Sequence, residues 1–347
     1  MALSALTTTV LFALRQQLPP RYQPALKKMF VKGIVTFNTK SIAFDKIKKG
    51  RKLAPLVSPM VAGKPNKAKG GTMTSVEPAY VKPTDVVTPD RLIKRQAGEA
   101  LMGTQSPAQR LNAIRADMLL EQDEAIERRE EWMLCEVLKT GAVTLEGESF
   151  EPINVDYGRS AENNVTLSGS DLWSARLAAD VDKNDNQPLL DVENWMDRCN
   201  VVCDAVVMGK DAWSTFRQFQ SVKDVLDTRR GSNAQAEIGP LNNSAFQWVG
   251  RIGTVDYYVY KGAFEGDDGN DELYIDANGV LCTSKDVEIY MAYGGIQDAK
   301  ANANGFVEAT RYPSNWYTDN PSVEWLQTQA APVPVMLDAD DACYARV

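Results

Sequence analysis

The stretch from Ser106 to Gly141 constrains the fold more than any other part of the sequence. Ser106 is a favourable N-cap, Pro107 suits the first helical position, and neither Gly nor a further Pro occurs before Gly141. The pattern predicts a helix of roughly 33 residues, about 50 Å long at 1.5 Å per residue. Gln122 and Arg129 interrupt its apolar stripe, so the helix does not support a coiled-coil seam. We expect a long helix that lies across a sheet.

A segment rich in Pro, Gly and Lys precedes this helix, at residues 54–90. Two β-prone runs, residues 56–63 and 75–83, flank a lysine-rich tip that contains Gly70 and Gly71. Each run contains Pro, which lacks a backbone donor and is confined to edge positions in sheets. The pattern predicts a long two-stranded excursion, and such ribbons are only marginally stable alone in water. We therefore expect this segment to rest on a partner surface.

The rest of the chain alternates between strand-like and helix-like segments, which is typical of a mixed α/β region. Strands are predicted at residues 142–147, 151–158, 200–209, 253–264, 271–284 and 287–295, and helices at residues 190–200 and 210–228. The first two strands form a hairpin, and Asn278-Gly279 is a favourable turn for another. Residues 323–347 alternate enough to form strand again, and we expect them to rejoin the sheet beneath the long helix.

The composition is that of a folded protein that lacks the residues of several common active sites. Of the 347 residues 44% are apolar and 24% are charged, so the chain can form one large domain or two ordinary ones. Histidine is absent, which excludes Ser-His-Asp and Cys-His catalysis and histidine-based metal sites. The five cysteines include no CxxC pair, so we interpret them as reduced core residues of an intracellular protein.

The sequence contains no apolar run of the roughly 18–20 residues that span a bilayer. The apolar run that begins at residue 10 resembles part of a signal peptide, but no positive charge precedes it and no small-residue cleavage site follows. We expect neither a membrane span nor secretion.

Positive charge is concentrated in the N-terminal segment, residues 1–53. It contains eleven basic residues and one acid, Asp45, for a net charge of +10; since the chain carries −8, the other 294 residues carry −18. A short apolar helix is expected around Ala5–Leu14, before Pro19-Pro20, and the segment is otherwise too poor in apolar residues to form a core. Basic arms often bind nucleic acid, but we favour contact with acidic surface on copies of this chain.

Short motifs do not identify a catalytic, cofactor or metal site. Neither G-x-x-x-x-G-K-[ST] nor G-x-G-x-x-G occurs. Residues 180–191 place acidic or amide side chains at several EF-hand positions, but Asp185 stands where the sharp turn needs Gly, so we expect a solvated loop. The acidic residues 265–272 are interpreted as a surface turn. We predict no cofactor, no metal ion and no catalytic residue.

Several uncommon segments, taken in order, carry a resemblance to a known family. They are VSPMVAGK (57–64), KGGTMTSVEPAYVKP (69–83), EPINVDYGRSAENN (151–164), FRQFQSVKDVLDTRRGSN (216–233) and GGIQDAKANANGFVEATRYPSNW (294–316). Together they resemble the major capsid proteins of lambda-like tailed bacteriophages, which belong to the HK97-type capsid family. The resemblance runs from about residue 54 onward, and the N-terminal arm departs from the family's pattern, which leaves its contacts open.

The resemblance implies an α+β, HK97-like capsid fold. Its parts would be an N-arm at residues 1–53, an extended E-loop at 54–90, a P-domain at 91–185 and 300–347, and an A-domain at 186–299. The P-domain would hold the long spine helix and a sheet, and the A-domain would be mixed α/β. In such shells the E-loop lies over the adjacent subunit, which is consistent with a ribbon that has little core of its own.

The resemblance also implies contacts between subunits. We assign them to Lys64, Lys69, Gly70, Gly71, Glu124, Arg128, Arg159, Arg229 and Arg230. Glu124 and Arg128 stand four residues apart on the solvent side of the long helix. Arg229 and Arg230 follow a predicted helix end, and their planar guanidinium groups suit carboxylates on a neighbour. Pairing within the chain and contact with an anion or DNA stay open for these two arginines.

These observations predict a major capsid protein that self-assembles as hexamers and pentamers into the icosahedral head of a phage virion around its dsDNA. We expect assembly in the host cytoplasm with scaffold and portal proteins, a decoration protein on the shell, non-specific DNA contact and no membrane. Because lambda-like shells rely on decoration, no isopeptide cross-link is predicted at Lys64, Lys67, Lys69 or Lys82. Deletion of residues 1–53 is expected to abolish assembly and to spare the folded body.

Two alternative functions stay open. One is a Ser-Lys hydrolase that acts in head maturation, since such a pair needs no histidine. The other is a nucleic-acid-binding protein that uses the basic arm.

Overall fold

The computed structural model describes most of the chain. The described residues are 8–16, 22–47, 71–93, 106–147, 150–179, 188–227, 244–266, 268–303 and 307–347, with single positions at 56, 59 and 305. Residues 180–187 of the loop expected at 180–191, most of the run at 56–63, and Lys64, Lys67, Lys69, Gly70, Arg229 and Arg230 lie outside them. Residues 188–191 begin a helix, so the loop prediction is wrong for that part.

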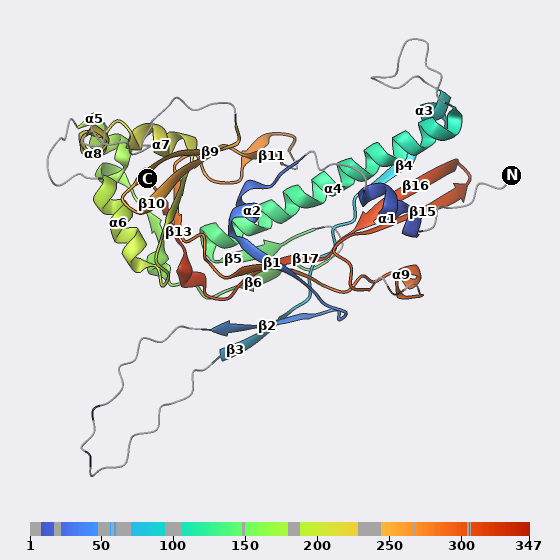
Figure 1. The fold of residues 1–347 in the computed structure, drawn as a ribbon, viewed down its shortest axis with the longest axis horizontal. Coiled ribbons are helices and arrows are strands. Elements are labelled where there is room, and N and C mark those ends of the chain that lie inside the picture. Colours follow the sequence, from blue (N-terminus) through green and yellow to red (C-terminus); the bar gives the residue numbers. More distant parts are fainter. Residues whose placement is uncertain are drawn as a thin grey trace.

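The long helix α4 (Pro107–Thr140) is confirmed, and its ends lie where the sequence predicts them. The Gln109 N–H donates to the Ser106 hydroxyl at 3.3 Å, and the Ser106 N–H donates to the Gln109 side chain at 2.9 Å, which completes a capping box. At the other end Gly141 adopts a left-handed φ of 76°, and its N–H donates to the Val137 carbonyl at 2.9 Å. The helix runs across the middle of the molecule (Figure 1).

A six-stranded sheet lies at one end of α4. Its order is β7 (Asn164–Thr166), β18 (Cys343–Arg346), β13 (Gly279–Thr283), β8 (Ala205–Met208), β10 (Val255–Tyr260) and β9 (Phe246–Ile252). The helices gathered at this end in Figure 1 are α5 (Trp173–Ala178), α6 (Pro188–Arg198), α7 (Lys210–Phe216) and α8 (Gln220–Asp227). The strand expected at 200–209 is confirmed as the fully buried β8, and the helix expected at 210–228 is divided into α7 and α8.

Aromatic rings and thiols fill the core between this sheet and its helices. Trp173 stacks on Trp195 and contacts Phe216, and both tryptophans are buried. All five cysteines are free and buried, as their interpretation as core residues requires, and four of them lie in this core.

The hairpin predicted across Asn278-Gly279 is wrong. A turn does form there, because the Gly279 N–H donates to the Asp276 carbonyl at 2.8 Å. However, the preceding strand β12 (Asp271–Leu273) pairs with β11 (Ala263–Glu265), whereas β13 enters the six-stranded sheet. Tertiary pairing has therefore overridden a locally favourable hairpin signal. The acidic segment at 265–272 is an exposed hairpin tip, as its interpretation as a surface turn predicts.

Two three-stranded sheets underlie α4. One has the order β15 (Tyr312–Asp319), β16 (Ser322–Gln329), β4 (Thr84–Val87), and the other has the order β1 (Val31–Thr36), β14 (Ile289–Tyr293), β17 (Pro332–Met336). β16 and β17 both contact α4, so the expectation that residues 323–347 rejoin the sheet beneath the helix is confirmed. β14 and β18 cross the expected boundary between residues 186–299 and residues 300–347, since each pairs on the other side of it.

A two-stranded ribbon projects from this body (Figure 1), and its pairing differs from the expected one. β3 (Gly71–Val76) pairs with β2 (Ile42–Ile47), not with a strand at 56–63. The base of the ribbon is held because Ile42, Phe44 and Val76 are buried in the main core. The segment expected to form the arm therefore also provides one side of the ribbon.

The remaining elements are short. The hairpin of β5 (Ala142–Leu145) and β6 (Ile153–Asp156) is confirmed, as is the amphipathic helix expected at 190–200, which is α6. The others are α1 (Thr8–Gln16), α2 (Ala25–Phe30), α3 (Pro89–Ile93), α9 (Ala299–Ala303) and the 3₁₀ turns Ala161–Asn163, Gly169–Asp171 and Ala339–Asp341. Among the described residues no helix is both long and apolar enough to cross a bilayer.

Candidate functional site

The N-terminal arm packs on the acidic face of α4 through buried apolar side chains and ion pairs. α2 adds Leu26 and Phe30 to the main core, and both side chains are fully buried. α1 adds Leu11 to a smaller core beside the N-terminal half of α4. The arm is thus attached at two places, with α4 beneath both.

Glu131 of α4 holds the beginning of α2. Its carboxylate accepts the backbone N–H of Leu26 at 2.8 Å and of Lys27 at 2.9 Å, and also the Tyr260 hydroxyl at 3.0 Å. Pro24, the N-cap of α2, provides no side-chain acceptor, so a carboxylate from another helix replaces the usual cap. Burial raises the pKa of Glu131, and the two backbone donors lower it by less.

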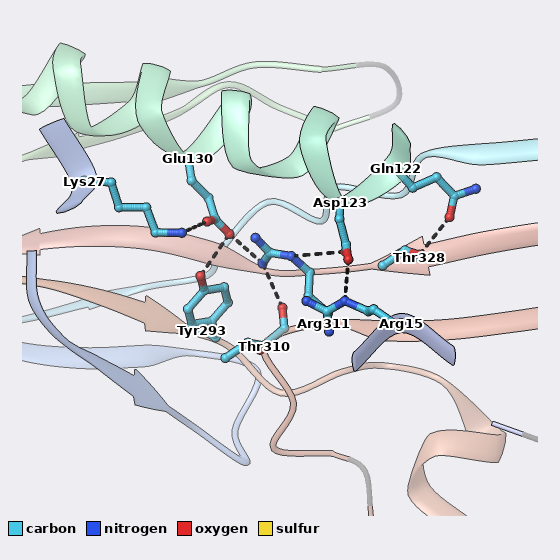
Figure 2. Close-up of polar contacts among 9 residues, drawn as sticks. All are labelled: Arg15, Lys27, Gln122, Asp123, Glu130, Tyr293, Thr310, Arg311 and Thr328. Carbon is cyan, nitrogen blue, oxygen red and sulfur yellow. Dashed lines mark hydrogen bonds and ion pairs between the residues drawn. The ribbon is translucent and has the colours of Figure 1, made fainter. Parts of the chain in front are cut away.

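Alternating charges connect the two helices of the arm beneath α4 (Figure 2). The Lys27 ammonium lies 2.5 Å from Glu130, whose other carboxylate oxygen lies 2.6 Å from the Arg311 guanidinium. Arg311 also reaches Asp123 at 3.9 Å, and Asp123 accepts a hydrogen bond from Arg15 of α1. We call these five residues the charge network. It joins two cations of the arm to two carboxylates of α4 through one central arginine.

The centre of the charge network is a buried ion pair between Glu130 and Arg311. Glu130 is fully buried and Arg311 is 4% exposed, and the Tyr293 hydroxyl donates to Glu130 at 2.9 Å. Burial alone would raise the pKa of Glu130, but Arg311 and Lys27 outweigh it and hold that pKa below its ordinary value. Burial alone would lower the pKa of Arg311, but Glu130 and Tyr293 outweigh it and raise that pKa. Removing one member would leave a buried charge without compensation.

A second buried polar network lies between the N-terminal half of α4 and the sheet β15-β16-β4. The Arg115 guanidinium donates to Glu324 at 2.8 and 3.0 Å and to the Tyr317 hydroxyl at 2.9 Å. The Asn315 amide donates to Glu324 at 2.7 Å. Arg115 and Glu324 are 5% and 3% exposed, so this pair fixes the helix on the sheet in a nearly dry environment.

Gln122 makes further polar contacts with the same sheet, about two turns further along α4. Its amide donates to Asp85 at 2.7 Å and to the Leu326 carbonyl at 2.9 Å, and its oxygen accepts from the Thr328 hydroxyl at 2.7 Å. Figure 2 shows the last of these bonds beside the charge network. Gln122 thus has a structural reason for interrupting the apolar stripe.

Arg159 has a role within its own chain that the sequence does not predict. Its guanidinium donates to three successive carbonyls at the end of α4, those of residues 137–139, at 2.8 to 3.1 Å. It also donates to the Ala339 carbonyl at 3.0 Å. Burial lowers the pKa of Arg159 to about 10. The carbonyls of residues 138 and 139 have no backbone donor within the helix, so Arg159 caps α4 in its own chain, and its assignment to a contact between subunits stays a prediction.

Glu124 and Arg128 form the pair that their spacing predicts, at 3.0 Å. The Arg128 guanidinium lies 5.0 Å from the ring centre of Tyr22, which belongs to the arm. Gly71 is the first residue of β3, opposite Ile47. Lys82 lies 5.0 Å from the ring centre of Tyr80. The structure thus brings Glu124 and Arg128 together near the arm and places Gly71 far away, at the ribbon.

The residues that dock the arm could not be identified from the sequence. We expected the basic arm to meet acidic surface on copies of this chain, whereas Arg15 and Lys27 meet Asp123 and Glu130 of their own chain. The opposite charges of the two segments predict the contact but not which copy provides it. Arg311 has no signal in the sequence, because its partners are distant in the chain.

The comparisons with known proteins identify the family. A family model described as phage major capsid protein E matches residues 7–347. The chain belongs to the phage major capsid protein E family. The match includes most of the arm, which the resemblance in short segments leaves out.

Curated relatives agree with this membership. The capsid protein is 32% identical over 341 residues to the major capsid protein of Escherichia phage lambda, which covers 98% of both chains. It is 31% identical over 340 residues to the major capsid protein of Enterobacteria phage phi80, which covers 97% of this chain and 98% of the relative. The protein is therefore a structural component of the virion capsid of a lambda-like phage.

Solved structures agree on the fold. The putative capsid protein of an E. coli CFT073 prophage superposes with a TM-score of 0.77 at 24% identity and 99% coverage of both chains. The capsid protein of cyanophage P-SCSP1u has a TM-score of 0.51 at 11% identity, with 100% of this chain and 91% of that chain covered. The α+β fold is thus the HK97-like capsid fold that the sequence predicts.

Proposed function

We propose that this capsid protein self-assembles as hexamers and pentamers into an icosahedral head shell that encloses the phage dsDNA. The observation that carries the proposal is the β2–β3 ribbon, which projects from the body (Figure 1). Its base is buried, but Met73 is 73% exposed, and a two-stranded ribbon has too little core to be stable alone. In a shell, the surface of a neighbouring copy would support the ribbon.

The proposed contacts between subunits follow from this. Gly71 would act at the end of the ribbon, and Lys64, Lys69 and Gly70, like Arg229 and Arg230, belong to segments outside the described residues. Glu124 and Arg128 are kept because the Arg128 side chain is 42% exposed beyond its contacts within the chain. Many modest contacts of this kind add up in a closed shell, although each is weak alone.

The partners of the shell belong to the same proposal. We infer a scaffold and a portal during assembly in the host cytoplasm, a decoration protein on the finished head, and non-specific contact with packaged DNA. We also infer that the protein has no catalytic activity. The nucleic-acid-binding alternative is weakened because Arg15 and Lys27 of the arm are already paired with carboxylates.

A loop replacement tests the role of the ribbon without unfolding the body. Ile47 and Gly71 are directly opposed, so residues 48–70 can be replaced by Asn-Gly, which suits a two-residue hairpin loop. We expect this variant to fold, because β2 and β3 keep their pairing, but to form no shells in cells that supply the other head proteins. Negative-stain microscopy beside wild type is the measurement.

The outcomes separate two questions. Normal shells from the shortened variant would show that the ribbon is not needed for assembly. A dispersed wild-type monomer with hydrolytic activity would overturn the proposed function itself. Deletion of residues 1–53 is no longer a clean test, because it removes β1 and the buried side chains of Leu26 and Phe30 from the core.

A further inference from the structure

β1 is an edge strand that exposes apolar side chains. It pairs with β14 on one side, and no described strand pairs with its other side. Ile34 is 58% exposed and Val35 is 41% exposed. Since neighbouring residues of a strand point to opposite faces, β1 is apolar and open on both faces near its end. Unpaired apolar edges of this kind are sites of strand addition.

A groove lies beside this edge, between β1 and the residues around the beginning of α2. It has a volume of about 480 Å³ and is lined by apolar groups of Tyr22, Pro24, Val31 and Ile34. The groove is therefore large enough to receive one or two apolar side chains from outside.

The surroundings of the groove are mostly basic. Residues 21–36 contain four Lys and Arg and no acid, and Glu127 of α4 is the one acid among the described residues that line the groove. Lys28 is exposed and bonds to the neutral Gln23 side chain, and Lys32 lies 3.8 Å from an Asp286 carboxylate that is itself 89% exposed. Neither cation is buried in a pair, so both can meet an acidic partner.

The β11–β12 hairpin has the complementary properties. Residues 263–273 contain five acids and no base. Glu265 and Asp271 are exposed and directly opposed, an arrangement that destabilises a hairpin unless a cation lies nearby. β12 pairs only with β11 among the described strands, and Leu273 at its end is 41% exposed. The hairpin thus offers a free edge, an apolar side chain and an excess of negative charge.

We propose that the edge of β1 and its groove bind the acidic β11–β12 hairpin of a second copy of this chain. Lys28 and Lys32 would meet Glu265 and Asp271, and Leu273 would enter the groove beside Ile34. Opposite charges select the hairpin, and apolar burial adds to the contact. The inference rests on the proposed function, since a shell brings copies side by side.

Charge reversal tests this contact. The double variant K28E/K32E places like charges against the hairpin, and we expect the assembled fraction to fall about tenfold or more. The quadruple variant K28E/K32E/E265K/D271K restores opposite charges with the two sides exchanged, and we expect it to recover assembly. The matched control K210E/K223E makes the same charge change at exposed positions of α7 and α8. All variants are produced with the other head proteins, and shells are quantified by sedimentation and negative-stain microscopy.

Each outcome decides the inference. The inference is supported if K28E/K32E loses assembly, the quadruple variant recovers it, and the control forms normal shells. Normal shells from K28E/K32E would overturn it. Loss without recovery, in variants whose circular dichroism matches wild type, would also overturn it and would point to another acidic occupant of the groove. If wild type itself formed no shells, the proposed function would fail first, and this inference with it.

Discussion

The two ends of α4 contact the sheets beneath them in different ways. Near its N-terminal end the buried contacts of Arg115 and Gln122 are hydrogen bonds to strand residues. Near its C-terminal end the buried residues are apolar, such as Leu134 and Leu138. Apolar packing is non-directional, whereas a hydrogen-bonded pair permits one arrangement. We infer that the polar end fixes the position of the helix and that the apolar end contributes more of the net stability.

The largest expected effect breaks the polar end. R115M leaves the Glu324 carboxylate buried without its cation, which should destabilise the unassembled subunit by about 3–5 kcal/mol. The double variant R115M/E324L removes both charges and should recover much of this loss. Urea unfolding of the three proteins is the measurement. Equal stability of the single and double variants would show that the pair does not behave as a buried ion pair.

The next effect tests the apolar end. L134A removes a fully buried side chain and should destabilise the subunit by about 2–4 kcal/mol through lost burial and a cavity. L190A, at a side chain that is 49% exposed, is the control and should cost less than about 1 kcal/mol. Here no second substitution should restore stability as E324L does for R115M. A cost for L134A as small as that of L190A would contradict the assignment of stability to this end.

A smaller effect concerns pH, at the arm between the two ends. The pKa of Glu130 is lowered in the folded protein, so its contribution to stability is lost as the pH falls through that lowered value. The pKa of Glu131 is raised, so the folded protein takes up this proton first, and acidification through that range favours the folded state. E130Q should therefore flatten the acid side of the stability–pH curve, and E131Q should steepen it.

Unfolding by urea at several pH values below 7 measures both slopes. One protonation changes the slope by at most about 1.4 kcal/mol per pH unit. Slope changes of the same sign in E130Q and E131Q would contradict the opposite shifts that the two environments impose.

The smallest effect lies at the exposed beginning of α4. S106A removes the side-chain half of the capping box and should cost about 1 kcal/mol. S106D keeps an acceptor for the Gln109 N–H and should stay close to wild type. Thermal unfolding of the two variants side by side is the measurement. A loss from S106A as large as that from R115M would mean that the N-terminal turn, rather than the buried pair, fixes this end.

The sequence predicts the parts of the fold that depend on local signals. The bounds of α4 follow from Ser106, Pro107 and Gly141, each of which acts within one turn of the helix. The β5–β6 hairpin and α6 follow from short periodic patterns in the same way. The family resemblance adds the overall architecture.

Contacts between distant segments were not predictable from the same signals. β3 pairs with β2 rather than with residues 56–63, because burial of Ile42 and Phe44 decides the pairing and no local pattern shows it. Asn278-Gly279 forms a turn but no hairpin for a similar reason. The cap that Arg159 forms was not predicted, because an arginine in a polar loop gives no sign of the helix end that it contacts.

The exchange of strands between the two halves of the molecule has a mechanical consequence. β14 lies within residues 186–299 but pairs with β1 and β17, while β18 comes from beyond residue 300 and lies between β7 and β13. Separating residues 186–299 from residues 300–347 would break strand pairing in two sheets, so the described residues do not form two bodies joined by a simple hinge. We therefore expect a load on a shell subunit to pass between these segments through paired strands.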